Sequence, residues 1–287
     1  YDMEGDKPMD RLICGDVGFG KTEVALRAGF RAVTNAKQVI VLVPTTVLAR
    51  QHYHTFKERF EKYGATVGIL SRFVTQKDQK QYIENFKKGL LDVLIGTHRV
   101  LSKDIIPKDL GLLVVDEEQR FGVEQKEIIR EIKKSVDTLT MSATPIPRTL
   151  QMSLMGLKDM SMIETPPKNR YPVQTYLVER NEALVKEAIE REIARGGQVF
   201  YLFNRVSGMT GMLQKLKKLV PSARIAYAHG KLHRDELEDV LTNFIEHEYD
   251  VLISTTIIET GIDIPNGAEG APKESPRDLF LIFCYFF

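Results

Sequence analysis

The stretch Gly15-Asp-Val-Gly-Phe-Gly-Lys-Thr22 decides the fold class, because it has the form G-x-x-x-x-G-K-T of a P-loop. It follows the apolar stretch 11–14, which predicts a strand, and it opens a helical pattern over 22–33. Glycines let backbone N–H groups close around phosphate oxygens, and the start of a helix adds partial positive charge. A chance glycine-rich turn matches this pattern in roughly one chain of this length in a hundred. The stretch therefore predicts a nucleotide-binding α/β domain.

Short apolar stretches alternate with longer amphipathic patterns on the C-terminal side of this loop. The apolar stretches are rich in Val, Ile and Leu, as expected for strands buried on both faces, and helical patterns such as 181–195 and 235–247 lie between them. This alternation predicts parallel sheets with helices on both faces. No repeat of fixed period is visible, so we expect any likeness between the parts to be architectural. The predicted strands are 11–14, 38–43, 66–70, 92–96, 112–116, 138–142, 173–178, 198–203, 223–228 and 250–254.

A proline-rich segment marks the boundary between two predicted domains. The chain has 287 residues, which suggests about two domains, and the segment 165–172 contains three prolines that cannot continue a helix or a central strand. We therefore expect a first lobe over 1–165, a linker over 166–172, a second lobe over 173–266 and an atypical tail over 267–287.

Composition excludes several classes of protein. Lys and Arg number 40 against 39 Asp and Glu, so the net charge of +1 excludes a globally basic nucleic-acid coat but not a local basic groove. The two cysteines argue against a disulfide framework and fit a reducing, cytoplasmic location. The longest apolar stretch, 279–287, is far shorter than the roughly 20 residues that a membrane-spanning helix needs, so we expect no membrane partner.

A second motif, Leu112-Leu-Val-Val-Asp-Glu-Glu-Gln119, places carboxylates at the end of a predicted strand, where open α/β sheets bind ligands. The expected catalytic residues are Lys21, which can reach the β- and γ-phosphates, and the pair Asp116 and Glu117. Asp116 and the Thr22 hydroxyl would hold Mg²⁺, and Glu117 would polarise the attacking water. The alternative is a solvated acidic helix start, which the P-loop upstream makes the weaker interpretation.

A third motif, Ser142-Ala-Thr-Pro-Ile-Pro-Arg-Thr149, also follows a predicted strand. The hydroxyls of Ser142 and Thr144 could sense the γ-phosphate, or they could cap a helix that begins near 146. Taken alone, the motif favours the cap.

The histidines give no sign of a metal site. His52 and His54 lie two positions apart on a predicted helix, so their side chains point in different directions. We interpret both as surface residues.

Together these motifs resemble the motor core of superfamily 2 helicases and translocases, in which two RecA-like lobes clamp ATP. The stretches 44–51 and 96–100 resemble the two DNA-contact motifs of the first lobe, and 255–265 resembles motif V of the second. The resemblance implies ATP and Mg²⁺ as cofactors, with contacts from Gly15, Asp16, Gly18, Gly20, Lys21, Thr22, Gln119, Gly261 and Asp263. It implies nucleic-acid contacts from Thr45, Thr46, Arg50, Thr97, His98, Thr255 and Thr256, and coupling through Ser142 and Thr144.

Longer stretches narrow the resemblance to the bacterial transcription-repair coupling factor family. These stretches are 15–25, 116–122, 143–149, 164–175 and 203–206, and the match extends over about 2–266. The RecG branch-migration helicases share the general pattern but typically have a small residue in place of Phe19, and Gln-His in place of Glu118-Gln119.

The resemblance implies a motor that hydrolyses ATP to move along double-stranded DNA without unwinding it. Members of the family displace stalled RNA polymerase and recruit nucleotide-excision repair proteins, through domains that are absent from these residues. Two alternatives stay open: a RecG-type branch-migration core, and a nucleotide-dependent DNA-binding module that does not hydrolyse ATP.

The match stops at Asn266, where the family continues with a strand and a Gln-x-x-Gly-Arg-x-Gly-Arg segment that supplies arginine fingers. Arginine fingers are worth roughly 10³–10⁵ in rate. We therefore expect an incomplete second lobe, weak binding of Mg-ATP and poor hydrolysis. The tail is interpreted as a frameshifted or prematurely ended reading frame, or else as a strand that completes the second sheet, since 279–287 has strand propensity.

Overall fold

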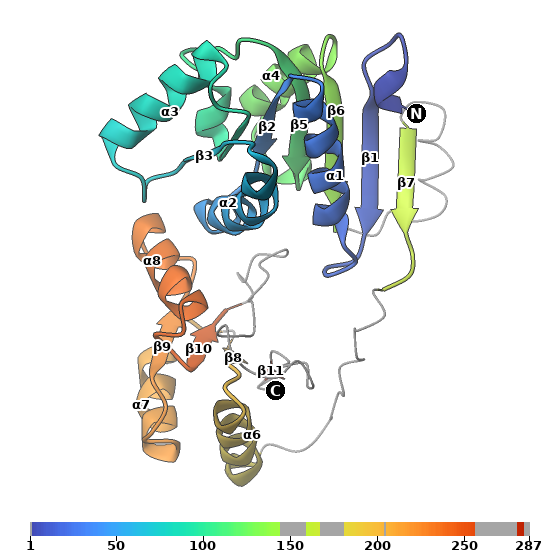
Figure 1. Cartoon of the computed structure of the whole chain (residues 1–287). Coiled ribbons are helices and arrows are strands. Elements are labelled where there is room, and N and C mark those ends of the chain that lie inside the picture. Colours follow the sequence, from blue (N-terminus) through green and yellow to red (C-terminus); the bar gives the residue numbers. More distant parts are fainter. Residues whose placement is uncertain (1, 144–158, 167–180, 204, 256–279, 284–287) are drawn as a thin grey trace. The chain divides into compact units, whose positions relative to one another are not determined.

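The first unit contains a seven-stranded parallel sheet in which strands distant in sequence lie side by side (Figure 1). The computed structural model describes residues 2–143, 159–166, 181–203, 205–255 and 280–283, and the chain divides into two units, Tyr1–Pro167 and Lys168–Phe287. The strand order of the first sheet is β3-β4-β2-β5-β6-β1-β7. Its strands are β1 (Asp10–Gly15), β2 (Gln38–Leu42), β3 (Val67–Leu70), β4 (Val93–Gly96), β5 (Leu110–Asp116), β6 (Asp137–Ser142) and β7 (Asp159–Ile163).

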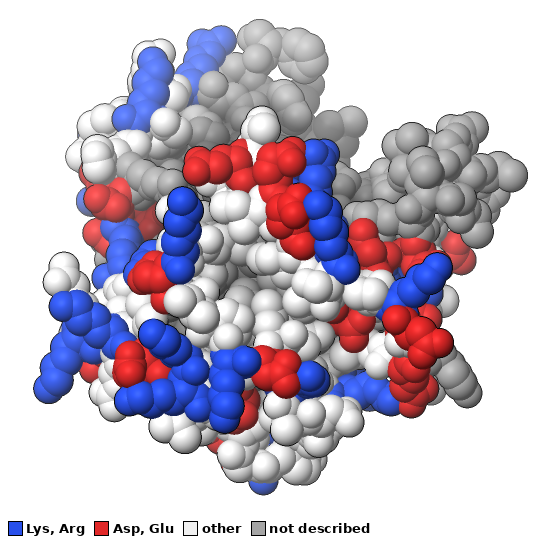
Figure 2. Space-filling model, turned by 90° about the horizontal axis from the view of Figure 1, so that it is seen from above, with Lys and Arg blue, Asp and Glu red and all other residues white. Residues whose placement is uncertain are grey.

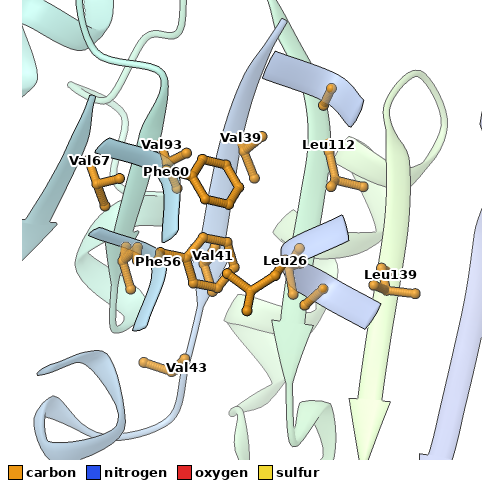
Figure 3. Close-up of a cluster of buried hydrophobic side chains, with 14 of the residues drawn as sticks. Leu26, Val39, Val41, Val43, Phe56, Phe60, Val67, Val93, Leu112 and Leu139 are labelled. Carbon is orange, nitrogen blue, oxygen red and sulfur yellow. The ribbon is translucent and has the colours of Figure 1, made fainter. Parts of the chain in front are cut away.

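Two separate cores cover this sheet, because successive side chains of a strand point to opposite faces. Val39 and Val41 of β2 pack with Phe56 on the face covered by α1 and α2, as Figure 3 shows. Ile40, between them in sequence, packs with Phe86 on the face covered by α3 and α4. The helices are α1 (Lys21–Thr34), α2 (Thr46–Phe60), α3 (Gln76–Lys88) and α4 (Val123–Lys133), and the 3₁₀ turns are η1 (Asp2–Glu4), η2 (Glu61–Tyr63), η3 (His98–Leu101) and η4 (Glu118–Arg120).

The second unit contains a smaller parallel sheet of order β11-β8-β10-β9. On one face Tyr201 packs with Leu216 of α7, and on the other the ring of Phe200 lies 4.9 Å from the ring of Phe244 of α8. Helices therefore cover both faces here as well. The elements are α6 (Glu182–Ala194), β8 (Val199–Leu202), α7 (Met209–Leu219), β9 (Ile225–Ala228), α8 (Arg234–Ile245), β10 (Val251–Ser254) and β11 (Phe280–Phe283).

The predicted fold class is confirmed: the chain is α/β, with two parallel sheets. The predicted strands in the described ranges coincide with β1–β6 and β8–β10 to within two residues at each end, while the predicted strand 173–178 lies outside those ranges. Strand β7 was not predicted. Its sequence, Asp-Met-Ser-Met-Ile, has no run of β-branched residues, and the strand forms by pairing with β1 at the edge of the sheet.

The tail contributes a strand to the second sheet. Phe280–Phe283 pairs in parallel with β8, with Phe280 opposite Val199. This is the pairing expected if the tail completes the sheet, which was one of the two interpretations of the tail.

Charges of both signs are mixed on the face of the molecule drawn in Figure 2. Figure 2 shows basic and acidic side chains next to one another, in agreement with the near-neutral net charge of +1. Within the described ranges, no helix has the length and apolar character required to cross a membrane.

Candidate nucleotide and nucleic-acid site

The loop between β1 and α1 has the backbone conformation that its glycines allow. Gly18 has a φ of 76° and Gly20 a φ of 85°, both in the left-handed region that other residues rarely adopt. No heavy atom lies within 4 Å of a Cβ built at either position, so the backbone angle and not crowding requires glycine there. Gly20 is also the N-cap of α1 and makes no side-chain capping bond. The loop and the first turn of α1 thus present backbone N–H groups suited to phosphate oxygens.

Lys21, the first residue of α1, extends back over this loop. Its Nζ donates hydrogen bonds to the carbonyl oxygens of Gly15 at 2.7 Å and Asp16 at 3.0 Å. Burial lowers the pKa of Lys21, and the nearby charges of Asp116 and Glu117 act in the opposite direction. The ammonium group therefore lies in the electrostatic field of the two carboxylates at the end of β5.

Strand order brings these groups together, because β1, β6 and β5 are neighbours and all three are parallel. Glu117 follows β5 with a φ of 51°, an uncommon conformation for a residue other than glycine, and only 2% of its surface is exposed. Its backbone N–H donates to Met141 O at 2.9 Å, and its Oε1 accepts from the Ala143 N–H at 2.8 Å. Gln119 donates its amide to Glu117 Oε2. Glu117 is thus held in place by groups at the ends of two neighbouring strands, β5 and β6.

Asp116 contacts His52, a residue of α2. His52 is buried, with 6% of its surface exposed, and its Nε2 lies 3.1 Å from Asp116 Oδ2. The interpretation of His52 as a surface residue is therefore wrong, whereas His54 is exposed. The spacing of four residues from Leu48 to His52 and from His52 to Phe56 could have revealed this, since both neighbours lie on the buried face of α2.

Glu118 takes part in a different network, although it follows Asp116 and Glu117 directly. Its Oε2 accepts hydrogen bonds from Lys133 Nζ at 3.1 Å and from the Thr140 hydroxyl at 3.3 Å. Glu118 therefore ties α4 to β6. Because Asp116 and Glu117 are buried, this acidic string is not a helix start exposed to solvent.

The other nucleotide-site candidates lie at the same edge or outside the described residues. Thr22 is half-buried in the first turn of α1, and Ser142 ends β6, the strand between β1 and β5, with 7% of its surface exposed. Thr144, Gly261 and Asp263 lie outside the described ranges.

In the first unit, the candidate nucleic-acid contacts follow two neighbouring strands, β2 and β4. Thr45 caps α2 by accepting the Leu48 N–H at 3.3 Å, which leaves its hydroxyl hydrogen able to donate to a phosphate oxygen. Thr46 and Thr97 are also buried, and His98 is exposed. Arg50 is half-buried on α2. The structure thus gathers the residues of both stretches at one edge of the sheet.

In the second unit, the ends of β9 and β10 lie side by side, with Ala228 opposite Ser254. Three polar atoms there are buried and have no hydrogen-bond partner in the part of the chain that the structure describes: His229 Nδ1, Ser254 Oγ and Thr255 Oγ1. Unpaired buried polar groups are costly, which favours a polar ligand at this edge. Thr256 lies outside the described ranges.

The donor set fits a magnesium–nucleotide complex. A lysine, a hydroxyl and backbone amides lie after β1 of the first sheet, and a buried carboxylate pair lies at the end of β5, with β6 between the two strands. Oxygen donors of this kind suit Mg²⁺, and amides with an ammonium suit phosphate. The chemistry of this donor set is therefore that expected of a magnesium–nucleotide site.

The fold and this site define a nucleotide-driven motor of the helicase type. The DEAD/DEAH box helicase family matches residues 3–153, and the helicase conserved C-terminal domain matches residues 179–268. The chain belongs to the DEAD/DEAH box helicase family, whose members are ATP-dependent helicases and translocases.

Among curated proteins, the chain is 62% identical over 265 residues to the transcription-repair-coupling factor of Bacillus subtilis (strain 168) and 57% identical over 265 residues to that of Staphylococcus aureus (strain USA300). Both matches cover 92% of this chain, and they cover 22% and 23% of the relatives, so the chain spans less than a quarter of their length. The resemblance to the transcription-repair coupling factor family that the motifs predicted is confirmed.

Among solved structures, RecG bound to a three-way DNA junction matches with a TM-score of 0.77 and 38% identity, covering 92% of this chain and 36% of that one. Dbp5 of S. cerevisiae, in complex with RNA and ADP BeF3, matches with a TM-score of 0.62 and 22% identity, over 91% of this chain and 69% of that one. The likeness to Dbp5 concerns the fold alone.

Proposed function

We propose that this chain is the ATP-driven motor part of a double-stranded DNA translocase that acts in transcription-coupled repair. The observation that carries the proposal is the convergence of Lys21 with the buried pair Asp116 and Glu117 at the ends of β1 and β5. The identity of 62% to a transcription-repair-coupling factor supports the choice of translocase. Displacement of stalled RNA polymerase and recruitment of nucleotide-excision repair proteins are proposed for the whole protein, through domains outside these residues.

In the proposed mechanism, the P-loop amides and Lys21 hold the β- and γ-phosphates, and Lys21 exchanges its bonds to loop carbonyls for phosphate oxygens. Thr22 and Asp116 would hold Mg²⁺, which neutralises developing charge on the phosphates. Glu117 orients and polarises the attacking water, and its bonds to Ala143 N–H and Gln119 fix the carboxylate before the reaction.

The proposed DNA contacts are made to phosphates. Hydroxyls and backbone amides at the strand ends carrying Thr45, Thr46, Thr97 and Thr255 suit phosphate oxygens, which position a protein without reading sequence. A translocase requires such sequence-independent contacts. The structural match to RecG on a DNA junction supports DNA as the nucleic acid.

Nucleotide binding by the 287-residue chain tests the proposal. A fluorescent ATP analogue with Mg²⁺ should bind the wild type, and Lys21→Ala should weaken binding about ten- to hundredfold, because charge-assisted bonds to phosphate are lost. Lys103→Ala is the matched control, since Lys103 is an exposed lysine of the same unit. Equal affinities of Lys21→Ala and the wild type would exclude the P-loop as the nucleotide site.

Turnover by the purified chain tests the expected poor hydrolysis. The 287 residues contain no Gln-x-x-Gly-Arg-x-Gly-Arg run, so the purified chain should hydrolyse ATP slowly. DNA-stimulated hydrolysis that Lys21→Ala abolishes would contradict this expectation. The match to RecG makes a branch-migration core the second candidate, and preferential binding to branched over linear duplex DNA would favour it.

A further inference from the structure

His52 is a polar residue on an otherwise apolar helix face. It lies on α2 between Leu48 and Phe56, which are both buried, and its own exposed fraction is 6%. Burying an imidazole costs free energy unless it is hydrogen-bonded, and a leucine would suit this face better. The contact of 3.1 Å with Asp116 supplies the required hydrogen bond.

The chemistry of the pair defines which atom donates. A carboxylate oxygen accepts, so in the tautomer that makes this bond Nε2 of His52 donates its hydrogen and Asp116 Oδ2 accepts it. His52 Nδ1 is buried and has no hydrogen-bond partner within the residues that the structure describes. The imidazole ring also lies 6.3 Å from the ring of Phe56 on the same helix. The bond to Oδ2 limits rotation of the Asp116 carboxylate.

The same helix connects this contact to the candidate nucleic-acid residues. Thr45 caps α2, Thr46 begins it, and Arg50 lies two residues before His52. Hydrogen bonds weaken steeply as their geometry departs from linear. A shift of α2 on contact with DNA would therefore change the hold of His52 on Asp116.

We propose that His52 is a positioning residue, which orients the Asp116 carboxylate for the magnesium–nucleotide complex and links that carboxylate to the DNA-contacting helix α2. The inference rests on the proposed function, because it assigns a partner to a carboxylate of that site. His52 lies outside the sequence motifs described above, and the acidic stretch 116–118 gives no sign of it.

The test measures binding of a fluorescent ATP analogue to the 287-residue chain, with Mg²⁺ and with EDTA in its place. His52→Leu keeps the volume and removes the N–H donor, and it should reduce the Mg²⁺-dependent gain in affinity about ten- to hundredfold. Affinity in EDTA should stay at the wild-type value, because the phosphate-binding loop is untouched. His52→Gln, which keeps an N–H at similar reach, should recover most of the gain. His54→Leu, on the exposed side of the same helix, should match the wild type.

A second measurement tests the link to DNA. Linear duplex DNA should raise the affinity of the wild type for the magnesium–nucleotide complex, and His52→Leu should lose most of that effect while His54→Leu keeps it. An equal Mg²⁺ gain and an equal DNA effect in His52→Leu and the wild type would overturn the inference. Failure of His52→Leu to fold would also contradict it, since only carboxylate orientation should be lost. Absence of nucleotide binding by the wild type would instead refute the proposed function.

Discussion

Gln38 in the first unit and Gln198 in the second hold their sheets together in the same way, but with different numbers of partners. Gln38 begins β2 and Gln198 directly precedes β8. Each is nearly inaccessible to solvent, and its Nε2 donates to two backbone carbonyls. Gln38 Oε1 also accepts two backbone N–H groups, whereas Gln198 Oε1 has no partner among the described residues. The partners are Phe86 O (2.7 Å), Leu91 O (2.8 Å), Lys108 N (2.7 Å) and Asp109 N (3.1 Å) for Gln38, and Phe244 O (2.5 Å) and Tyr249 O (2.8 Å) for Gln198.

The sequence around these carbonyls recurs between the two units. Asn85-Phe86 and Asp92-Val-Leu-Ile95 return as Asn243-Phe244 and Asp250-Val-Leu-Ile253, with the same spacing. Each pair joins the end of a helix to a buried strand, β4 or β10. The likeness between the units therefore extends from architecture to individual residues.

The comparison also bears on the tail. The segment Pro107-Lys-Asp-Leu110 supplies the two N–H groups to Gln38, from Lys108 and Asp109, and leads into β5, which pairs with β2. Pro276-Arg-Asp-Leu279 precedes β11, which pairs with β8. This match favours the interpretation of the tail as a strand of the second sheet over that of a frameshift.

The largest expected effect tests whether the two units are built alike. Phe86→Ala and Phe244→Ala should each cost about 3–5 kcal/mol, because both side chains are fully buried and their removal leaves a cavity. Hydrogen exchange of peptides from β4 and β10, resolved by mass spectrometry, reports the two units separately. A loss of stability in only one of the two variants would show that the recurring phenylalanines do not stabilise their units equally.

Much of the first unit could be predicted from sequence, because its signals are local. Buried strands appear as runs of Val, Ile and Leu. The P-loop is a short continuous stretch, so its motif can be recognised without knowledge of the fold. Strand β7 could not be predicted, because Asp159–Ile163 has a weak pattern and depends on pairing with β1, which lies far away in sequence.

The sequence predicted the individual residues of the site better than the contacts between them. The contact between His52 and Asp116 joins residues 64 positions apart, and it depends on how α2 packs on the sheet. The different partners of Glu117 and Glu118 also follow from the sharp turn after β5, which the string of acidic letters does not reveal.

A smaller effect should distinguish the two glutamines. Gln38→Ala removes four hydrogen bonds and should cost about 4 kcal/mol, whereas Gln198→Ala removes two and should cost about 2 kcal/mol. The same exchange measurement on β4 and β10 gives both values.

The controls are exposed glutamines in each unit, Gln76→Ala and Gln214→Ala, which should change little. Equal losses at Gln38 and Gln198 would contradict the expected difference between the two glutamines. The two glutamines would then contribute equally to the stability of their units.

The smallest effect concerns the aspartates that recur in the two units. Asp92 accepts from the Thr66 hydroxyl, whereas Asp250 accepts from the Arg224 guanidinium at 2.8 Å. Burial raises the pKa of Asp250, but the hydrogen bonds from Arg224 outweigh that effect, so the pKa lies below its ordinary value. The resulting stability is present above the unfolded pKa of about 3.9 and is lost as pH falls through the lower folded pKa.

Because half of the Arg224 side chain is exposed, Arg224→Ala should cost about 0.5 kcal/mol at neutral pH and nothing in strong acid. High salt should shrink that loss, but not the loss in Thr66→Ala, whose hydrogen-bond donor is neutral. Thermal unfolding followed by circular dichroism at several pH values and salt concentrations measures both variants, and a loss in Arg224→Ala that persists in strong acid would assign its role to packing and not to charge.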